Sequence, residues 1–386
     1  MVGFMASGIA FQNNQVALGW LAFDMTGDTR ALGFALFVHG VAMAVGSLAG
    51  GVIADRFNRS VTIIGLQVVM TGVALVMALL LLFDALELWH LYLVSAATGA
   101  LMSLHMPSRQ AFVYNIVGKR HLANAMALNM GTMNAMRLIG PGIAGVLIGS
   151  VGIEAVYFVT VAGFVVSIAV MLFYIGPTNQ LYSADIESPI RSMADGFAYL
   201  WRRRPLFWMF VLAMGGAVLG IPFRDLLPAF AVDALGQGPE GYGVLLSMVG
   251  LGALIGSVSI ASLARFQHRG LLTIGGGVGI GVLMIAVSFA SGLGAALPLF
   301  LLLGWASTTF STTIAIIIQT GVDDAFRGRM ASIYMLTFSI HPAGALALGI
   351  LANETGIAAA FMIAGLALLG FIIVMTVWRK DVRTLA

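Results

Sequence analysis

The chain has 386 residues, 60% of them hydrophobic and 9% charged, with a formal net charge of +3 and no cysteine. Soluble domains average roughly 45–50% apolar and about 25% charged residues, so this composition excludes a soluble globular protein and predicts an integral membrane protein. The lack of cysteine excludes disulfides and thiolate metal ligands, and the small positive charge, which falls between apolar stretches, does not indicate a nucleic-acid partner.

The first half contains apolar stretches that are long enough to cross roughly 30 Å of hydrocarbon as helices. They lie at 2–24, 31–54, 61–83, 89–112, 122–149 and 154–176. The first stretch carries four consecutive amide side chains, Gln12 to Gln15, near its middle. Successive helical residues point in different directions, so these amides cannot all face one cavity. Asn14 and Gln15 are the two that we expect to line a substrate cavity.

A charged turn separates the second and third apolar stretches. Its sequence, Gly51-Val-Ile-Ala-Asp55-Arg56-Phe-Asn-Arg59, has the pattern G-x-x-x-D-R-x-x-R. We expect Asp55, Arg56 and Arg59 to form a gate. In it the Asp55 carboxylate accepts hydrogen bonds from a neighbouring helix end or an arginine while the inner mouth is closed. Arg109, at the inner end of the fourth stretch, is the expected partner. The alternative is a loop whose charges only fix the topology.

Arg137 lies near the middle of the fifth stretch, where a charge that meets neither water nor a partner costs a few kcal/mol (about 2.5 or more). Polar and small side chains share about a 140° arc of this helix with it. We expect this stripe to line a central cavity, in which Arg137 pairs with an anionic or polar group of a substrate. A structural hydrogen bond to a neighbouring carbonyl is the alternative. The stripe consists of Asn129, Met133, Asn134, Arg137, Gly140 and Pro141.

A polar interval divides the chain into three predicted parts. Residues 1–176 form an N-terminal six-helix bundle, 177–205 a cytoplasmic linker and 206–386 a C-terminal six-helix bundle. Within the linker, 193–201 is expected to form a helix on the inner leaflet. The apolar stretches of the last part lie at 206–230, 241–263, 271–291, 296–319, 330–352 and 356–378.

Two titratable residues of the second half are candidates for proton coupling. Asp225 lies in the seventh stretch beside Arg224, between Pro222 and Pro228. His341 lies in the eleventh stretch and can titrate near neutral pH. The alternatives are an outer-gate ion pair for Asp225 and a histidine satisfied within the helix bundle for His341.

The distribution of charge and a weak internal repeat predict the topology. Most of the 19 Lys and Arg residues fall in alternate loops, and because positive residues are retained inside, both termini are predicted to be cytoplasmic. A repeated six-helix unit is typical of transporters that bind substrate between their halves. The repeat pairs Gly33, Leu36, Gly40, Gly46, Ser47, Ala54 and Arg59 with Gly243, Leu246, Gly250, Gly256, Ser257, Ala264 and Arg269.

These features resemble the major facilitator superfamily (MFS), in particular its bacterial efflux branch of siderophore (enterobactin-type) and multidrug exporters. The resemblance implies an all-α membrane protein with twelve transmembrane helices in two pseudo-symmetric six-helix bundles, the MFS fold. It also implies a monomer in the bacterial plasma (inner) membrane. Besides the charged turn, the likeness includes Thr26-Gly27, Pro107-Ser-Arg109-Gln-Ala111, Asn124-Ala125, Gly140-Pro141, Leu227-Pro228, Gly241-Tyr-Gly243 and Arg327-Gly-Arg329-Met330.

The resulting prediction is a secondary active transporter that works by alternating access. It exports an amphipathic small molecule, a drug or a siderophore, in exchange for protons, and its other partner is membrane lipid. An enzyme is not expected, since the chain has no G-x-x-x-x-G-K-[ST] loop or H-E-x-x-H motif, and neither a cofactor nor a metal is expected. The alternatives are an uptake carrier, a lysolipid-flipping carrier, or a transport-inactive membrane receptor or scaffold.

Overall fold

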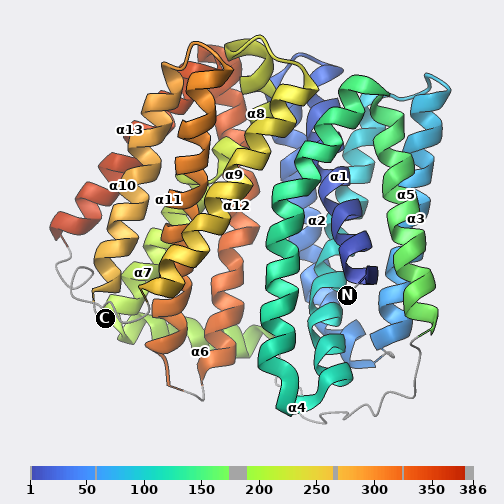
Figure 1. Cartoon of the computed structure of the whole chain (residues 1–386). Helices are drawn as coiled ribbons and strands as arrows, with labels where there is room; N and C mark the ends of the chain where they lie inside the picture. The colour runs from blue at the N-terminus through green and yellow to red at the C-terminus, as the bar shows by residue number, and fades with distance from the viewer. Residues whose placement is uncertain (1, 57–58, 174–188, 264–267, 324–325, 379–386) are drawn as a thin grey trace. The chain divides into compact units, whose positions relative to one another are not determined.

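The computed structural model describes the chain except for residues 1, 57–58, 174–188, 264–267, 324–325 and 379–386. For some residues inside helices, among them Asp55, Arg56 and Arg59, only the backbone is described. Throughout the described ranges the regular structure is helical, without strands (Figure 1). Among these helices, 8 are long and apolar enough to cross a membrane. The prediction of an all-helical membrane protein is therefore confirmed.

The chain folds as two compact units. Unit 1 comprises Met1–Ser183 and Gln237–Ser247, and unit 2 comprises Ala184–Gly236 and Met248–Ala386. The helix α9 (Pro239–Ser262) is divided between them, because its first residues belong to unit 1 and the remainder to unit 2. A short piece of the second half of the sequence is thus part of the first compact unit.

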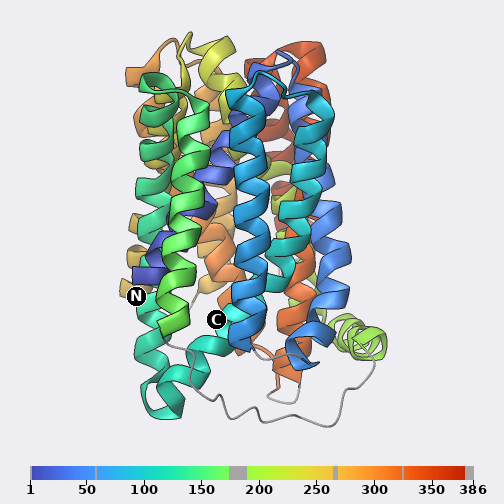
Figure 2. The same cartoon turned by 90° about the vertical axis from the view of Figure 1, so that its right-hand side faces the viewer.

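Unit 1 is built on helices that match the first predicted stretches. The most unusual is α4, whose 63 residues would be about 95 Å long if straight, roughly three times the thickness of the hydrocarbon layer. Figures 1 and 2 show α4 turning back at its lower end, so that its two arms run in opposite directions. The predicted stretches 89–112 and 122–149 occupy these arms. The helices are α1 (Val2–Asp24), α2 (Thr29–Arg56), α3 (Arg59–Leu82), α4 (Leu88–Ser150) and α5 (Ile153–Phe173).

Glycines bring α2 and the first arm of α4 into close contact. A Cβ atom at Gly99 of α4 would overlap the His39 carbonyl group of α2, and one at Gly46 of α2 would overlap Ser103 of α4. In lipid, the association of helices depends on van der Waals packing, which small residues permit because the backbones approach closely. A larger side chain at either glycine would separate the two helices.

Unit 2 contains one span that is not a regular α-helix. The stretch predicted at 206–230 passes through π-helical and 3-10 segments, because Pro222 and Pro228 have no N–H group and interrupt the helical hydrogen bonds. The segment is held by packed rings, since Phe230 stacks on Phe361 with centroids 5.2 Å apart and meets Phe300 at 5.4 Å. The span consists of α7 (Arg204–Gly215), η1 (Gly216–Gly220), η2 (Pro222–Arg224), α8 (Leu227–Ala229) and η3 (Phe230–Ala234).

The remaining helices of unit 2 follow the later predicted stretches. A shorter helix, α6 (Pro189–Arg202), precedes them and includes the predicted segment 193–201. Figure 1 shows α6 running crosswise to the long helices of its unit, and Figure 2, turned by a right angle, shows it end-on. The long helices are α10 (Arg269–Ser288), α11 (Leu293–Thr320), α12 (Arg327–Thr355), α13 (Ile357–Trp378) and the greater part of α9.

Candidate functional site

The broken span of unit 2 carries an acid beside a histidine. Asp225 directly follows η2, where the 3-10 turn that begins at Pro222 ends. His341 lies on α12, and its Nε2 atom is 3.0 Å from the Asp225 Oδ2 atom. The side chain of Asp225 is 21% exposed and that of His341 is 24% exposed. The structure therefore brings together the two residues that the sequence singled out separately as candidates for proton coupling.

The attraction between the two groups depends on their charges. The contact is an ion-pair approach rather than an aligned hydrogen bond, because neither the Asp225 Oδ2 atom nor the His341 Nε2 atom has an aligned hydrogen-bond partner among the described residues. Protonation of the carboxylate would remove the attraction, whereas protonation of the imidazole strengthens it. Ionisable groups inside a membrane segment mark ion and substrate pathways, and π-helical irregularities are frequent at functional sites.

A polar seam continues along α12 beside the pair. Thr337 lies four residues before His341 and so on the same helix face, and its hydroxyl donates a hydrogen bond to the carbonyl of Tyr334 at 2.7 Å. The phenol of Tyr334 in turn donates to the carbonyl of Ser311 on α11 at 3.1 Å. Hydroxyl groups therefore extend from the level of His341 toward the start of α12.

Unit 1 contains a small cavity with one polar side. Its volume is about 20 Å³, which is enough for about one water molecule. The His39 Nδ1 atom approaches the Thr98 hydroxyl oxygen at 3.4 Å on the polar side. Asn14 and Gln15, which were expected to line a substrate cavity, are among its lining residues, and their role in binding a substrate stays a prediction. The complete lining is Phe11, Asn14, Gln15, His39, Met70, Val73, Thr98, Met102 and Phe164.

A second buried polar group in unit 1 lies next to this cavity. The ring of Phe11, which lines the cavity, is 5.1 Å from the ring of His105. The His105 Nε2 atom approaches the Gln67 amide at 3.4 Å, and both side chains are almost fully buried. Sequence reasoning missed this pair. The signal was present, because Gln67 is an amide in the otherwise apolar stretch 61–83.

The remaining predicted site residues occupy different environments. Arg109 is only 4% exposed, and its guanidinium lies 4.6 Å from the centre of the Phe4 ring. Arg137 is exposed on the second arm of α4, where it has an interaction partner. Pro141 is buried, and its carbonyl oxygen would be 2.7 Å from a Cβ atom at Gly243. The carbonyl of Pro141 thus faces the first turns of α9.

The predicted gate residues lie outside the part of the chain whose side chains are described. This applies to Asp55, Arg56 and Arg59 at the junction of α2 and α3. Their roles therefore stay a prediction. Within the described ranges, no group of three or more His, Asp or Glu side chains is arranged to hold a metal ion.

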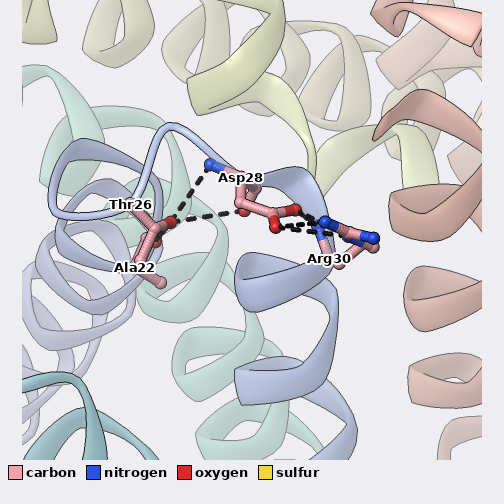
Figure 3. A network of polar contacts seen from close by, with 4 residues as sticks. All are labelled: Ala22, Thr26, Asp28 and Arg30. Carbon is pink, nitrogen blue, oxygen red and sulfur yellow. Dashed lines mark hydrogen bonds and ion pairs between the residues drawn. The ribbon is translucent and has the colours of Figure 1, made fainter. Parts of the chain in front are cut away.

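The link between α1 and α2, at the opposite end of α2 from the predicted gate, is an ordered turn (Figure 3). Gly27 adopts φ of +60°, which favours glycine. The Thr26 hydroxyl donates to the Ala22 carbonyl at 2.8 Å, and the Arg30 amide donates to the Asp28 carboxylate at 2.7 Å. The guanidinium of Arg30 donates to the same carboxylate at 3.0 Å. The hydrogen bonds from the Arg30 guanidinium and, less strongly, from the Arg30 amide lower the pKa of Asp28 below its usual value.

Comparison with known proteins identifies the family of the chain. The family model of the transmembrane secretion effectors, MFS_3, matches residues 3–384. The chain belongs to this family. It is 29% identical over 315 residues to the enterobactin exporter EntS of Shigella boydii serotype 18, an alignment that covers 80% of the chain and 74% of that exporter. The EntS protein of Escherichia coli O139:H28 matches equally, with 29% identity over the same shares.

Solved structures of other transporters have the same fold. A peptide transporter of the POT type superposes with a TM-score of 0.80 and 11% identity, covering 100% of this chain and 94% of that one. The nucleoside transporter NupG superposes with a TM-score of 0.71 and 14% identity, covering 99% and 97% of the two chains. The family match and the exporter relatives make this chain a membrane transporter of MFS type, and they confirm the prediction that it is not an enzyme.

Proposed function

We propose that this chain is a proton-coupled exporter of an amphipathic small molecule, of siderophore or drug type, that works by alternating access. In this proposal twelve spans, with both termini in the cytoplasm, form two six-helix bundles in the bacterial inner membrane. The retention of basic residues on one side supports the orientation. The twelve predicted stretches, all of which lie largely within helices, support the number of spans.

The ion pair between His341 and Asp225 is the observation that carries the proposal. A carboxylate within a span is costly unless it has a partner or a function. The 3.0 Å approach supplies the partner, and the regular helix is interrupted at Pro222 beside it. Broken spans of this kind form the ion and substrate sites of secondary transporters. One proton moving on and off this pair would link its charge to the state of the transporter.

The class of substrate is proposed from two features. The curated relatives are named as enterobactin exporters, which favours a siderophore-like molecule with several polar oxygens. Arg137 is exposed on the second arm of α4, and a guanidinium there suits an acidic or phenolic oxygen of such a molecule. Outward transport follows from the same relatives, so an uptake carrier is the weaker alternative.

The test is proton movement in liposomes that contain the purified chain and a pH-sensitive dye. A gradient of a catecholate siderophore is imposed across the membrane. We expect the unmodified chain to move protons across the membrane in the direction opposite to the flow of siderophore. The variants Asp225→Asn and His341→Gln should reduce this movement to the level of empty liposomes, because neither variant retains a carboxylate–imidazole pair that can hold and release a proton.

The control is Glu354→Gln, which removes an exposed carboxylate at the end of α12 and should leave proton movement unchanged. A thermal-shift measurement with the same siderophore shows whether each variant still binds. Proton movement by Asp225→Asn at the rate of the unmodified chain would remove the pair from the coupling step. If the unmodified chain transports siderophore and moves no protons, proton exchange is wrong.

A further inference from the structure

Helix α6 has three differently surrounded sides. One side is buried against the other helices of its own unit through Gly196 and Leu200. At 100° per residue, Phe197 and Trp201 lie next to that side, and these large apolar side chains are 39% and 57% exposed. Arg202 lies a further 100° around the helix, and it is exposed as well. A helix with one protein-facing side, one exposed apolar side and one charged side fits the boundary between lipid and water.

Contacts with the α11–α12 connection fix the orientation of α6. The Tyr199 phenol donates a hydrogen bond to the Asp323 carboxylate at 3.0 Å, and the Arg203 guanidinium donates two, at 3.0 and 3.2 Å. The Tyr199 ring also stacks on Phe326, with the centroids 4.3 Å apart. These contacts hold Tyr199 of α6 and Arg203, the residue that follows the helix. They therefore fix the rotation of α6 about its own axis, and with it the directions in which its exposed sides face.

The three successive arginines where α6 ends and α7 begins are not equivalent. Arg203 is paired with Asp323. The Arg204 guanidinium lies 5.0 Å from the centre of the Trp201 ring. Within the described parts of the chain, no carboxylate forms an ion pair with Arg202 or with Arg204, and both are exposed. Two cations therefore flank an exposed indole at the edge of the apolar spans.

We propose that Arg202, Trp201 and Arg204 form a binding site for the headgroup of an anionic phospholipid. The planar guanidinium groups suit bidentate hydrogen bonds to the phosphate oxygens. The indole and the neighbouring Phe197 would lie against the glycerol and the first methylenes of the acyl chains, the depth at which tryptophan is enriched. Opposite charge selects an acidic lipid over a zwitterionic one. The site depends on the membrane location of the chain and not on its substrate.

The test measures lipid retention by native mass spectrometry of the full chain in detergent, titrated with phosphatidylglycerol. We expect Arg202→Gln/Arg204→Gln to weaken phosphatidylglycerol binding by about tenfold or more, since each basic side chain near an anionic surface adds to the attraction. Arg202→Lys/Arg204→Lys should lose less, because charge remains while the bidentate geometry is lost. Circular dichroism and gel filtration establish that each variant is folded.

The control is Arg379→Gln/Lys380→Gln, which removes the same charge from the C-terminal end and should leave the affinity unchanged. Phosphatidylcholine and inorganic phosphate are titrated in parallel, and both should bind weakly to the unmodified chain. The proposal is overturned if the arginine double variant binds phosphatidylglycerol as tightly as the unmodified chain. It is also overturned if phosphatidylcholine or free phosphate binds as tightly as phosphatidylglycerol.

Discussion

Asp28 is the residue that precedes α2 and accepts hydrogen bonds from the first turn of that helix. Its Oδ1 atom accepts the Arg30 amide at 2.7 Å, and its backbone carbonyl accepts the Leu32 amide at 3.3 Å, so it caps the helix. The guanidinium of Arg30 adds an ion pair to the cap. Because the side chains of Asp28 and Arg30 are 30% and 56% exposed, solvent screens the pair, and its contribution is at most about 1 kcal/mol.

This cap predicts a defined pH dependence for the variant Arg30→Gln. The pKa of Asp28 is lowered in the folded state, so the stability it contributes is fully present above the unfolded pKa of about 3.9 and is lost as the pH falls through the folded value. We expect Arg30→Gln to lower the melting temperature slightly at pH 7. The difference from the unmodified chain should shrink below about pH 4.

Thermal unfolding in detergent at pH 7, 5 and 3 checks this expectation. The charge-conserving variant Arg30→Lys is the control and should retain most of the difference at pH 7. A gap between Arg30→Gln and the unmodified chain that stays constant down to pH 3 would assign the effect to packing rather than to the Asp28 carboxylate.

Individual site residues were easier to predict than their partners. Asp225, His341, Asn14 and Gln15 could be singled out because polar side chains are rare and costly in apolar spans. The 3.0 Å pairing of Asp225 with His341 could not be predicted, because one sequence does not tell which faces of two distant helices meet.

At the scale of elements, a close backbone contact in unit 1 joins the first turns of α9 to the second arm of α4. A Cβ atom at Gly243 would lie 2.8 Å from the Gly145 Cα atom and 2.7 Å from the Pro141 carbonyl oxygen. The nearby rings of Trp20 and Tyr242 stack with centroids 6.0 Å apart. Backbone therefore touches backbone here, and no flexible side chain can move aside.

This contact predicts that Gly243→Val destabilises the chain. Extra methyl groups force packed backbones apart, and overpacking of this kind typically costs about 1–3 kcal/mol. We expect a lower melting temperature and reduced transport. The matched control is Gly72→Val on α3, where a Cβ atom would meet nothing within 4 Å. Equal melting temperatures for the two variants would contradict the close contact.

The positions of the helices followed from hydropathy, whereas their irregularities did not. Apolar length predicted where each span lies, because the thickness of the bilayer sets that length. The interruption at Pro222 and Pro228 was not predicted, and the π-helical turns on either side of it depend on how the rings of Phe223 and Phe230 pack. Such packing involves neighbours far away in the sequence.

For the whole molecule, proton exchange predicts how transport responds to ionophores. In liposomes loaded with a catecholate siderophore, dissipating the pH gradient with nigericin should abolish siderophore movement against its gradient, because the driving force is removed. Valinomycin, which in the presence of potassium dissipates only the electrical potential, should leave a residual rate. Movement that is untouched by nigericin would exclude exchange with protons, and net accumulation on the other side would favour uptake.

The membrane class, the helical fold and the family were all predictable at this scale. Composition indicated a protein that is surrounded by lipid. The charged turn, together with motifs such as Gly140-Pro141 and Gly241-Tyr-Gly243, carried the family resemblance. The grouping of Gln237–Ser247 with unit 1 was not predictable, because a division by sequence halves assigns each span to a single side.

Helix α9 is one continuous helix that belongs partly to unit 1 and partly to unit 2. Its residues change membership between Ser247 and Met248, shortly before Gly250 and Gly252, while its hydrogen-bonded backbone continues to Ser262. A motion of one unit that the other does not follow would therefore require one of two changes. Either the first turns of α9 separate from Gly145, or the helix bends at Gly250 and Gly252. The first turns of α9 would then be its attachment to unit 1, and the glycines that follow would be its hinge.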